Sequence, residues 1–129
     1  MRRRVINCLK PLDAIAVENS AYPGTPDVNF VEGWLELKQL EEWPKRPDTP
    51  VTIEHFTAQQ RVWLIRRWRK RGNAFLLLRV GQEWFLFDGE TAATHVGKVN
   101  RIELIRLSLE YWPRGLKGKE LLYCLKSRN

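Results

Sequence analysis

Apolar and polar residues alternate in two pairs of short segments, as they do in half-buried β-strands. The first pair is Asp27–Val31 and Trp34–Leu40, with the compact turn Glu32–Gly33 between them. The second pair is Ala74–Val80 and Glu83–Asp88, joined by a Gly-Gln turn. Strands separated by two turn residues pair as antiparallel hairpins, so the sequence predicts two hairpins.

Two helices are predicted from their capping signals and from the residues that end them. A T-x-x-Q capping box opens a helix over Thr57–Arg71, which Gly72 ends. A second helix is predicted over Asn100–Trp112, because Asn100 is a favourable N-cap and Pro113 cannot continue the helix.

The other segments carry weaker signals. The order of the elements predicts a single α/β domain over residues 1–129, with a mixed central β-sheet flanked by helices. The weaker segments are a short helix over Arg2–Leu9 ended by Pro11, a brief strand over Ala14–Val17, a loop over Ser20–Pro26, irregular chain over the proline-rich Glu42–Pro50, and a strand or helix over Lys119–Lys126.

Composition limits the classes of function. A net charge of +7 and a pI near 9.8 favour a polyanion such as nucleic acid, but many basic proteins bind no specific partner. No apolar run approaches the roughly 18 residues that span a bilayer, and no signal peptide is evident, so we expect a cytoplasmic protein with no membrane partner. Cys8 and Cys124 lack zinc-binding spacing and are expected to be reduced thiols.

The same reasoning excludes several kinds of catalysis. The chain has no phosphate-binding P-loop and no GxSxG nucleophile elbow, which argues against ATP use and serine hydrolysis. His55 and His95 are isolated from other candidate ligands or nucleophiles, so we expect structural or solvent-exposed roles for them.

One charged group stands out within the first hairpin. Side chains alternate between the two faces of a strand, so Glu36 and Lys38 share one face while Leu35 and Leu37 occupy the other. Asp27 begins the partner strand and falls close to Leu37 or Lys38. Two carboxylates and one ammonium can therefore converge at one point of the hairpin.

This grouping suits phosphodiester hydrolysis. Two carboxylates can hold a hard divalent cation such as Mg²⁺, which activates water and offsets charge on the phosphate, while a lysine orients the attacking water. The alternative is an ordinary surface ion pair between Glu36 and Lys38, a contact that is common and weak.

The motif Gly24–Asp27 (GTPD), followed by Glu36–Lys38 (ELK), resembles the signature of the PD-(D/E)XK nuclease superfamily. With Glu18 upstream, and with Gln60 and Trp63–Leu64 on the following helix, the chain resembles small phage-type nucleases related to the VRR-NUC family. The resemblance covers roughly residues 15–88 and implies a restriction-endonuclease-like core.

The resemblance also implies roles for individual residues. Lys38 would position the attacking water, and Gln60 would lie beside the site unless it serves only as the capping residue. Glu18 would hold a water of the metal's shell or a second metal, unless it is only a surface carboxylate. The implied ligands of Mg²⁺, with Mn²⁺ as a substitute, are Asp27, Glu36, the backbone carbonyl of Leu37, and Glu18.

The helix Thr57–Arg71 has two contrasting faces when its residues are placed at about 100° intervals. Basic side chains beside an exposed indole suit contact with phosphates and stacking on an unpaired base, whereas the alternative is a solvated helix face. The face expected to pack on the core holds Val62, Leu64, Ile65 and Trp68, and the face expected to contact nucleic acid holds Trp63, Arg66, Arg67 and Lys70.

Taken with the resemblance, these residues indicate a Mg²⁺-dependent DNA endonuclease, with branched or Holliday-junction DNA as a candidate substrate. The resemblance further implies a homodimer, and the host cytoplasm as the location of a phage-encoded protein. Two alternatives stay open: a catalytically inactive nucleic-acid-binding module on a nuclease scaffold, and a structural protein whose acidic pair is a surface network.

Overall fold

A six-stranded β-sheet with helices on both faces organises the chain. The computed structural model describes residues 1–18 and 22–126. Its elements in chain order are α1 (Arg2–Cys8), the 3-10 helix η1 (Lys10–Leu12), β1 (Ile15–Ala16), β2 (Val28–Phe30), β3 (Gly33–Leu40), α2 (Ala58–Arg69), β4 (Asn73–Val80), β5 (Glu83–Asp88), α3 (Gly89–His95), α4 (Arg101–Leu107), β6 (Glu110–Trp112) and α5 (Gly118–Lys126).

The strands lie in the sheet in the order of the sequence, from β1 to β6. Every neighbouring pair is antiparallel except β3 and β4, which run parallel. Parallel neighbours need a long crossover, and here it consists of residues 41–57 followed by α2. The predicted fold class, α/β with a mixed sheet flanked by helices, is confirmed.

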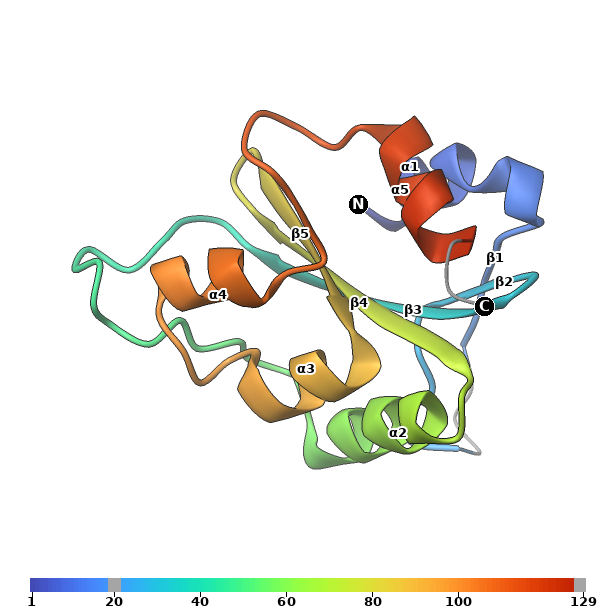
Figure 1. Cartoon of the computed structure of the whole chain (residues 1–129), viewed down its shortest axis with the longest axis horizontal. Coiled ribbons are helices and arrows are strands. Elements are labelled where there is room, and N and C mark those ends of the chain that lie inside the picture. Colours follow the sequence, from blue (N-terminus) through green and yellow to red (C-terminus); the bar gives the residue numbers. More distant parts are fainter. Residues whose placement is uncertain (19–21, 127–129) are drawn as a thin grey trace.

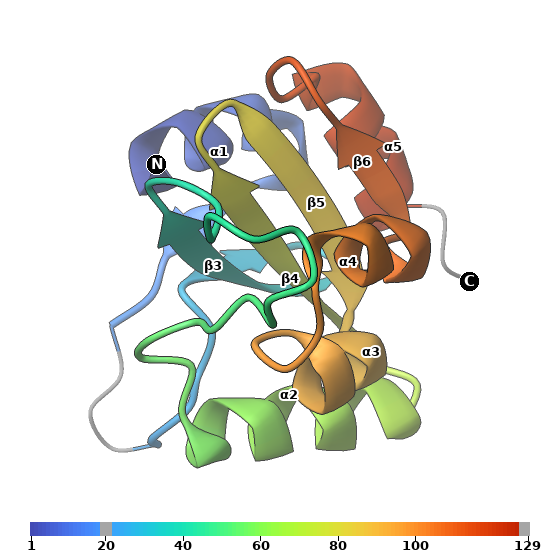
Figure 2. The same cartoon turned by 90° about the vertical axis from the view of Figure 1, so that its left-hand side faces the viewer.

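The two faces of the sheet are covered by different helices. Figure 1 shows α1 and α5 on one face and α2, α3 and α4 on the other, and Figure 2 shows α2 and α3 below the sheet in the turned view. In β4, Phe75 and Leu77 pack towards α1 and α5, whereas Leu76 and Leu78 pack towards α2 and α3. This strand is therefore apolar on both faces, as central parallel strands are.

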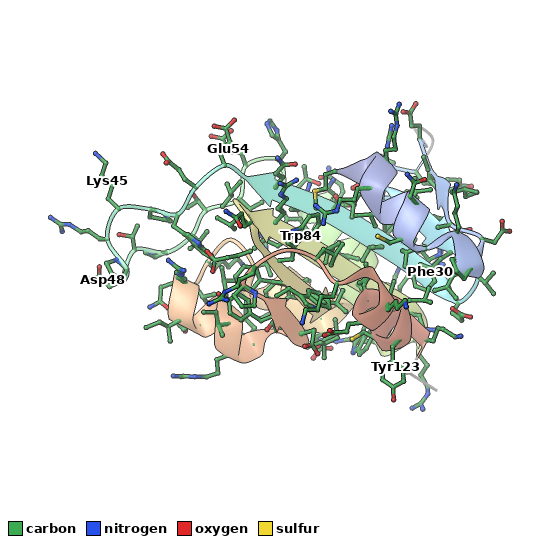
Figure 3. The ribbon with its side chains drawn as sticks, turned by 90° about the horizontal axis from the view of Figure 1, so that it is seen from above. Phe30, Lys45, Asp48, Glu54, Trp84 and Tyr123 are labelled. Carbon is green, nitrogen blue, oxygen red and sulfur yellow. The ribbon has the colours of Figure 1, made fainter. Side chains whose placement is uncertain are left out.

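The crossover from β3 to α2 first leaves the sheet and then returns to it. Figure 3 shows Lys45 and Asp48 at the outer end of this excursion. On the way back, the backbone N–H of Val51 donates to Val99 O at 2.8 Å, and Phe56 is buried against the α2 side of the sheet. The three prolines between positions 42 and 50 made an irregular segment here predictable, and that prediction is confirmed.

Most of the predicted elements are present, with small shifts. Both hairpins form, but the first turns at Val31–Glu32, one residue earlier than expected. Both halves of the Thr57–Gln60 capping box are present at the start of α2. The ambiguous C-terminal segment is a helix, α5, and within residues 1–18 and 22–126 no helix could span a membrane.

Three predictions about helices were wrong or incomplete. The helix opened by Asn100 ends at Leu107, because Glu110–Trp112 instead pairs with the edge of β5 as β6. There Trp112 is buried in the core on the α1 and α5 side, where a continued helix would not place it. Helix α2 ends two residues early, and Arg71 rather than Gly72 adopts the left-handed conformation, with φ of 69°.

Helix α3 had no expected counterpart. It is capped by Asp88, whose Oδ1 accepts from Thr91 N at 2.8 Å, and it begins at Gly89. A Cβ atom at Gly89 would lie 2.6 Å from Leu64 O and 2.9 Å from Ala74 O. The absence of a side chain therefore allows α3 to approach α2 and β4 at one point.

Substitution Gly89→Ala should test that close approach. Two backbone carbonyls cannot move away as a flexible side chain would, so we expect a loss of about 2 kcal/mol or more in the free energy of unfolding, measured by urea denaturation. The control Thr94→Ala changes an exposed residue of the same helix and should stay within about 0.5 kcal/mol of the parent. Equal stabilities of the two variants would contradict this account.

Candidate functional site

The end of the β2–β3 ladder creates an opening in the sheet. The last antiparallel pair is Val28 with Leu35, so β3 continues beyond its partner and Asp27 lies one residue past the ladder, in register with Glu36. The Asp27 side chain takes over the pairing, because its Oδ2 accepts a hydrogen bond from the backbone N–H of Leu37 at 2.9 Å. The carboxylate is thus fixed against the free edge of β3.

The loop that leads into Asp27 is held by close backbone packing on α2. Gly24 adopts φ of +90°, and a Cβ atom there would lie 2.5 Å from Gln59 O. Only glycine tolerates both the conformation and the approach. Within the GTPD motif, Gly24 is therefore required by the backbone geometry, and Asp27 supplies the carboxylate.

Glu36 and Lys38 lie on the same face of β3, as the alternation predicted, but they are buried. Their neighbours in β4 are Leu76 and Leu78, which face α2 and α3. Glu36 is 1% exposed and Lys38 is 9% exposed, while Leu35 packs on the opposite face. An ordinary ion pair on the protein surface is therefore excluded for these two residues.

Lys38 is held by three neighbours. Its Nζ lies 3.1 Å from Glu36 Oε2 and donates a hydrogen bond of 2.8 Å to the backbone carbonyl of His55. The same ammonium lies 5.6 Å from the centre of the Phe56 ring. The returning end of the crossover loop thus fixes the lysine beside the carboxylate.

The oxygens of Glu36 are not satisfied by these contacts. Despite the short distance to Lys38, neither Oε1 nor Oε2 accepts a hydrogen bond of suitable geometry within the described residues. Buried carboxylate oxygens without such partners are rare in proteins and require an explanation. A cation that binds both oxygens in the functional state would supply one.

The protonation of Glu36 leads to the same conclusion. Loss of hydration on burial, and secondarily the nearby Asp27 carboxylate, raise the pKa of Glu36 from an ordinary 4.5 to about 8, although Lys38 acts in the opposite direction. One ammonium is thus too little positive charge for two carboxylates at this position. A divalent cation bound to both carboxylates would favour the ionised form of Glu36.

The groups present fit a magnesium ion. Within residues 1–18 and 22–126, no group of three or more Asp, Glu, His or Cys side chains is placed to hold a metal. The side chains that lie together here are those of Asp27 and Glu36. Mg²⁺ is commonly bound by one or two carboxylates and keeps waters for its other positions. The carbonyl of Leu37 points to the same strand edge as its N–H, towards Asp27, and suits a further ligand.

Glu18 does not join this group through its side chain. Its Oε1 lies 3.6 Å from Arg2 Nη1, and the side chain is 83% exposed. The backbone nevertheless passes close, because Val17 N donates to Asp27 O at 2.8 Å. A role at the metal therefore stays a prediction for Glu18, and the neighbouring Asn19 lies outside the described residues.

Gln60 is the N3 residue of the capping box of α2, whose N-cap is Thr57. Its Oε1 accepts from Thr57 N at 3.0 Å, and its own N–H donates to Thr57 Oγ1 at 3.2 Å. The Gly24 backbone packs on the same turn of α2, so Gln60 lies near the entry to the site without contacting Glu36 or Lys38 through a hydrogen bond. Its catalytic role stays a prediction.

The faces of α2 differ from the helical-wheel assignment. Trp63 was expected to be exposed, but it is 6% exposed and packs edge-to-face on Trp34 at 5.3 Å. Val62 was expected in the core and is 57% exposed. Helix α2 packs on both β4 and α3. Its Trp63 side faces the interior, and Val62 is left on the exposed side. The three basic residues of the predicted surface, Arg66, Arg67 and Lys70, are exposed.

Sequence reasoning missed two contributors to the site. Nothing in the sequence marked the His55 carbonyl or the Phe56 ring, because His55 acts through its backbone in a left-handed conformation with φ of 62°. Trp34, by contrast, is placed on the face of Glu36 by simple alternation along the strand.

Of three comparisons with known proteins, only the comparison of solved structures finds a similarity. No protein-family model matches the chain, and no curated protein matches it. Among solved structures, the chain is similar to Hjc, a Holliday junction resolvase from the archaeal hyperthermophile Archaeoglobus fulgidus. The TM-score is 0.46 and the identity 20%, with 84% of this chain and 92% of that chain covered. This likeness is too weak to assign a function, which must be inferred from the site.

The raised pKa of Glu36 predicts a pH-dependent stability in metal-free solution. Between about pH 4.5 and pH 8, the folded chain keeps a proton on Glu36 that the unfolded chain has released, so the free energy of unfolding falls as pH rises through this window. Glu36→Gln should remove that loss and be more stable than the parent at pH 8 by on the order of 2 kcal/mol.

Thermal or urea unfolding in EDTA at pH 5 and pH 8 measures this difference. The matched control is Glu54→Gln, because Glu54 is 89% exposed and only two positions from Phe56. It should show the pH dependence of the parent. A Glu36→Gln variant with the same pH dependence as the parent would show that Glu36 titrates normally in the folded chain.

Proposed function

We propose that this chain is a Mg²⁺-dependent DNA endonuclease of the PD-(D/E)XK type. The observation that carries the proposal is the buried Glu36 carboxylate, which lies beside Asp27 and 3.1 Å from the Lys38 ammonium, with neither oxygen in a hydrogen bond of suitable geometry within the described residues. Binding of a catalytic divalent cation by Asp27 and Glu36 would explain why the Glu36 carboxylate is buried there. The sequence resemblance, in which the same three residues are the catalytic ones, supports it independently.

Each residue has a role that its position favours. Asp27 and Glu36, with the Leu37 carbonyl, would hold Mg²⁺, and Mn²⁺ should substitute for it. The ion, when bound, lowers the pKa of a coordinated water and offsets charge on the phosphate. Lys38, fixed by the His55 carbonyl, orients the attacking water and stabilises negative charge as it builds on the phosphate.

The reaction adds water across one P–O bond of the DNA backbone and leaves a phosphomonoester end and a hydroxyl end. The exposed Arg66, Arg67 and Lys70 of α2 would contact the DNA beside the cleaved bond. The excess charge of +7 favours DNA approach to this surface and predicts binding that weakens as salt is added.

Branched DNA, including the four-way Holliday junction, is the proposed substrate class. The support comes from the resemblance to small phage-type and VRR-NUC-related nucleases, some of which resolve junctions. Contacts from exposed arginines to phosphates suit recognition by shape and phosphate position. Two copies acting on a symmetric junction would form a homodimer.

The inactive-scaffold alternative has less support. A protein that only binds DNA would gain nothing from an ionisable carboxyl placed among apolar residues beside a second carboxyl, where burial opposes its charged form. An apolar residue at position 36 would stabilise such a scaffold. A buried Glu36 whose oxygens lack hydrogen bonds of suitable geometry is better explained by catalysis.

Cleavage of DNA in the presence of Mg²⁺ is the first test. The parent should cut four-way, flapped or nicked DNA with Mg²⁺ or Mn²⁺ and not with EDTA. Asp27→Asn, Glu36→Gln and Lys38→Met should each lower the rate by about 100-fold or more, since each removes a group that acts on the transferring phosphate.

The control for these variants is Glu54→Gln, which removes an exposed carboxylate close in sequence to the site and should cut at the rate of the parent. Circular dichroism spectra should confirm that all the variants fold. Cleavage that survives Glu36→Gln or Lys38→Met would eliminate the assigned site, whatever the metal requirement.

Substrate choice is tested separately from catalysis. At equal strand concentrations and in Mg²⁺, a four-way junction should be incised faster than a linear duplex of the same arm sequence. Incisions should fall at symmetric positions on two opposite strands if two copies act together. Equal rates on junction and duplex would remove the branched-substrate preference and leave a general endonuclease.

A further inference from the structure

A pocket lies next to the catalytic face, between the loop that leads to Asp27 and helix α2. It has a volume of about 380 Å³ and is lined by Tyr22, Pro23, Trp34, Trp63, Arg66 and Arg67, with Thr25 at its edge. Ligand pockets in proteins start at roughly this size. Trp34 stands two residues before Glu36 on the same strand face, about 7 Å along β3.

Aromatic and guanidinium planes form the interior of this pocket. Trp34 and Trp63 meet edge-to-face, with ring centres 5.3 Å apart and an angle of 72° between the planes. The guanidinium carbon of Arg67 lies 4.4 Å from the centre of the Trp63 ring. Planar groups of this kind stack on nucleobases whatever the base, because every base has a flat face.

The charge of the pocket is uncompensated. Arg69, one turn further along α2, pairs with Glu90 at 2.7 Å, whereas neither Arg66 nor Arg67 forms an ion pair among residues 1–18 and 22–126. Two arginines without an ion pair among these residues, beside two aromatic rings in edge-to-face contact, suit a ligand that is flat at one end and anionic at the other.

The hollow surface continues past the pocket along α2. A second hollow of about 320 Å³ shares Pro23, Trp63 and Arg66 with the first and extends to the exposed Val62. One arginine therefore borders both hollows. A single strand can follow this path with its phosphates near the arginines, but a base held inside a duplex cannot enter the first pocket.

We propose that this pocket binds one unpaired nucleotide next to the bond that is cut, with the base against Trp34 and Arg67 and its phosphate near Arg66. The assignment to a position beside the cut bond rests on the proposed function, but the binding does not. The pocket selects DNA that offers an unpaired base, such as a flap, a bulge or a branch point, without reading its sequence.

Two duplexes test the pocket, one with a single bulged adenosine and one with an abasic nucleotide at the same position. They have the same length and charge, so their difference isolates the base. Affinities measured by fluorescence anisotropy in EDTA exclude cleavage. We expect the parent to bind the bulged adenosine more tightly than the abasic bulge by on the order of tenfold.

Substitutions in the pocket should change the ratio of the affinity for the bulged adenosine to the affinity for the abasic bulge, rather than the affinity for both duplexes. Arg67→Gln and Tyr22→Ala should bring the ratio close to one, whereas Arg106→Gln, which removes an exposed arginine of α4, should weaken both duplexes equally and keep the ratio. A ratio near one in the parent, or a ratio unchanged in Arg67→Gln and Tyr22→Ala, would overturn the proposal.

The two proposals fail in different ways. A parent protein that cuts DNA with Mg²⁺ but does not distinguish the two bulges retains the nuclease function and loses the pocket. A parent that distinguishes the bulges but cuts no DNA retains the pocket and loses the nuclease function.

Discussion

Burial of the Glu36 carboxylate beside Asp27 is the constraint on which the rest of the site depends. Moving a carboxylate out of water is costly unless it is paired, and the ammonium of Lys38 is shared between Glu36 and the backbone carbonyl of His55. Without a cation, burial raises the pKa of Glu36 to about 8, so the carboxyl keeps its proton near neutral pH. The proposed cation would supply the positive charge that these two carboxylates lack.

The topology of the sheet brings the required groups together. Because β2 begins only at Val28, the side chain of the preceding Asp27 can occupy the free edge of β3. Because β3 and β4 are parallel, the chain must cross over, and the crossover delivers His55 and Phe56 to Lys38 before it forms α2. The same helix then carries the exposed arginines to the flank of the site. Apart from Asp27, which precedes β2, the candidate catalytic groups and the candidate DNA contacts thus lie on the β3–α2–β4 unit.

The sequence predicted the core of this arrangement because β-strand alternation is a strong local rule. It placed Glu36 and Lys38 on one face, and the predicted hairpin placed Asp27 within one or two residues of its observed register. It could not predict the burial of Glu36, which depends on the helices packed over that face. For the same reason the helical wheel assigned Trp63 to the outside, since α2 carries apolar residues on more than one side. The left-handed His55 and the strand β6 depend on contacts distant in sequence.

The most direct measurement is an anomalous difference map from crystals of the parent protein soaked in Mn²⁺ at pH 8. The account predicts a peak between the carboxylates of Asp27 and Glu36, close to the Leu37 carbonyl, and no peak there in crystals of Glu36→Gln. A well-ordered site without a peak, with the Glu36 carboxylate still turned only towards Lys38, would contradict the claim that these residues bind a catalytic cation.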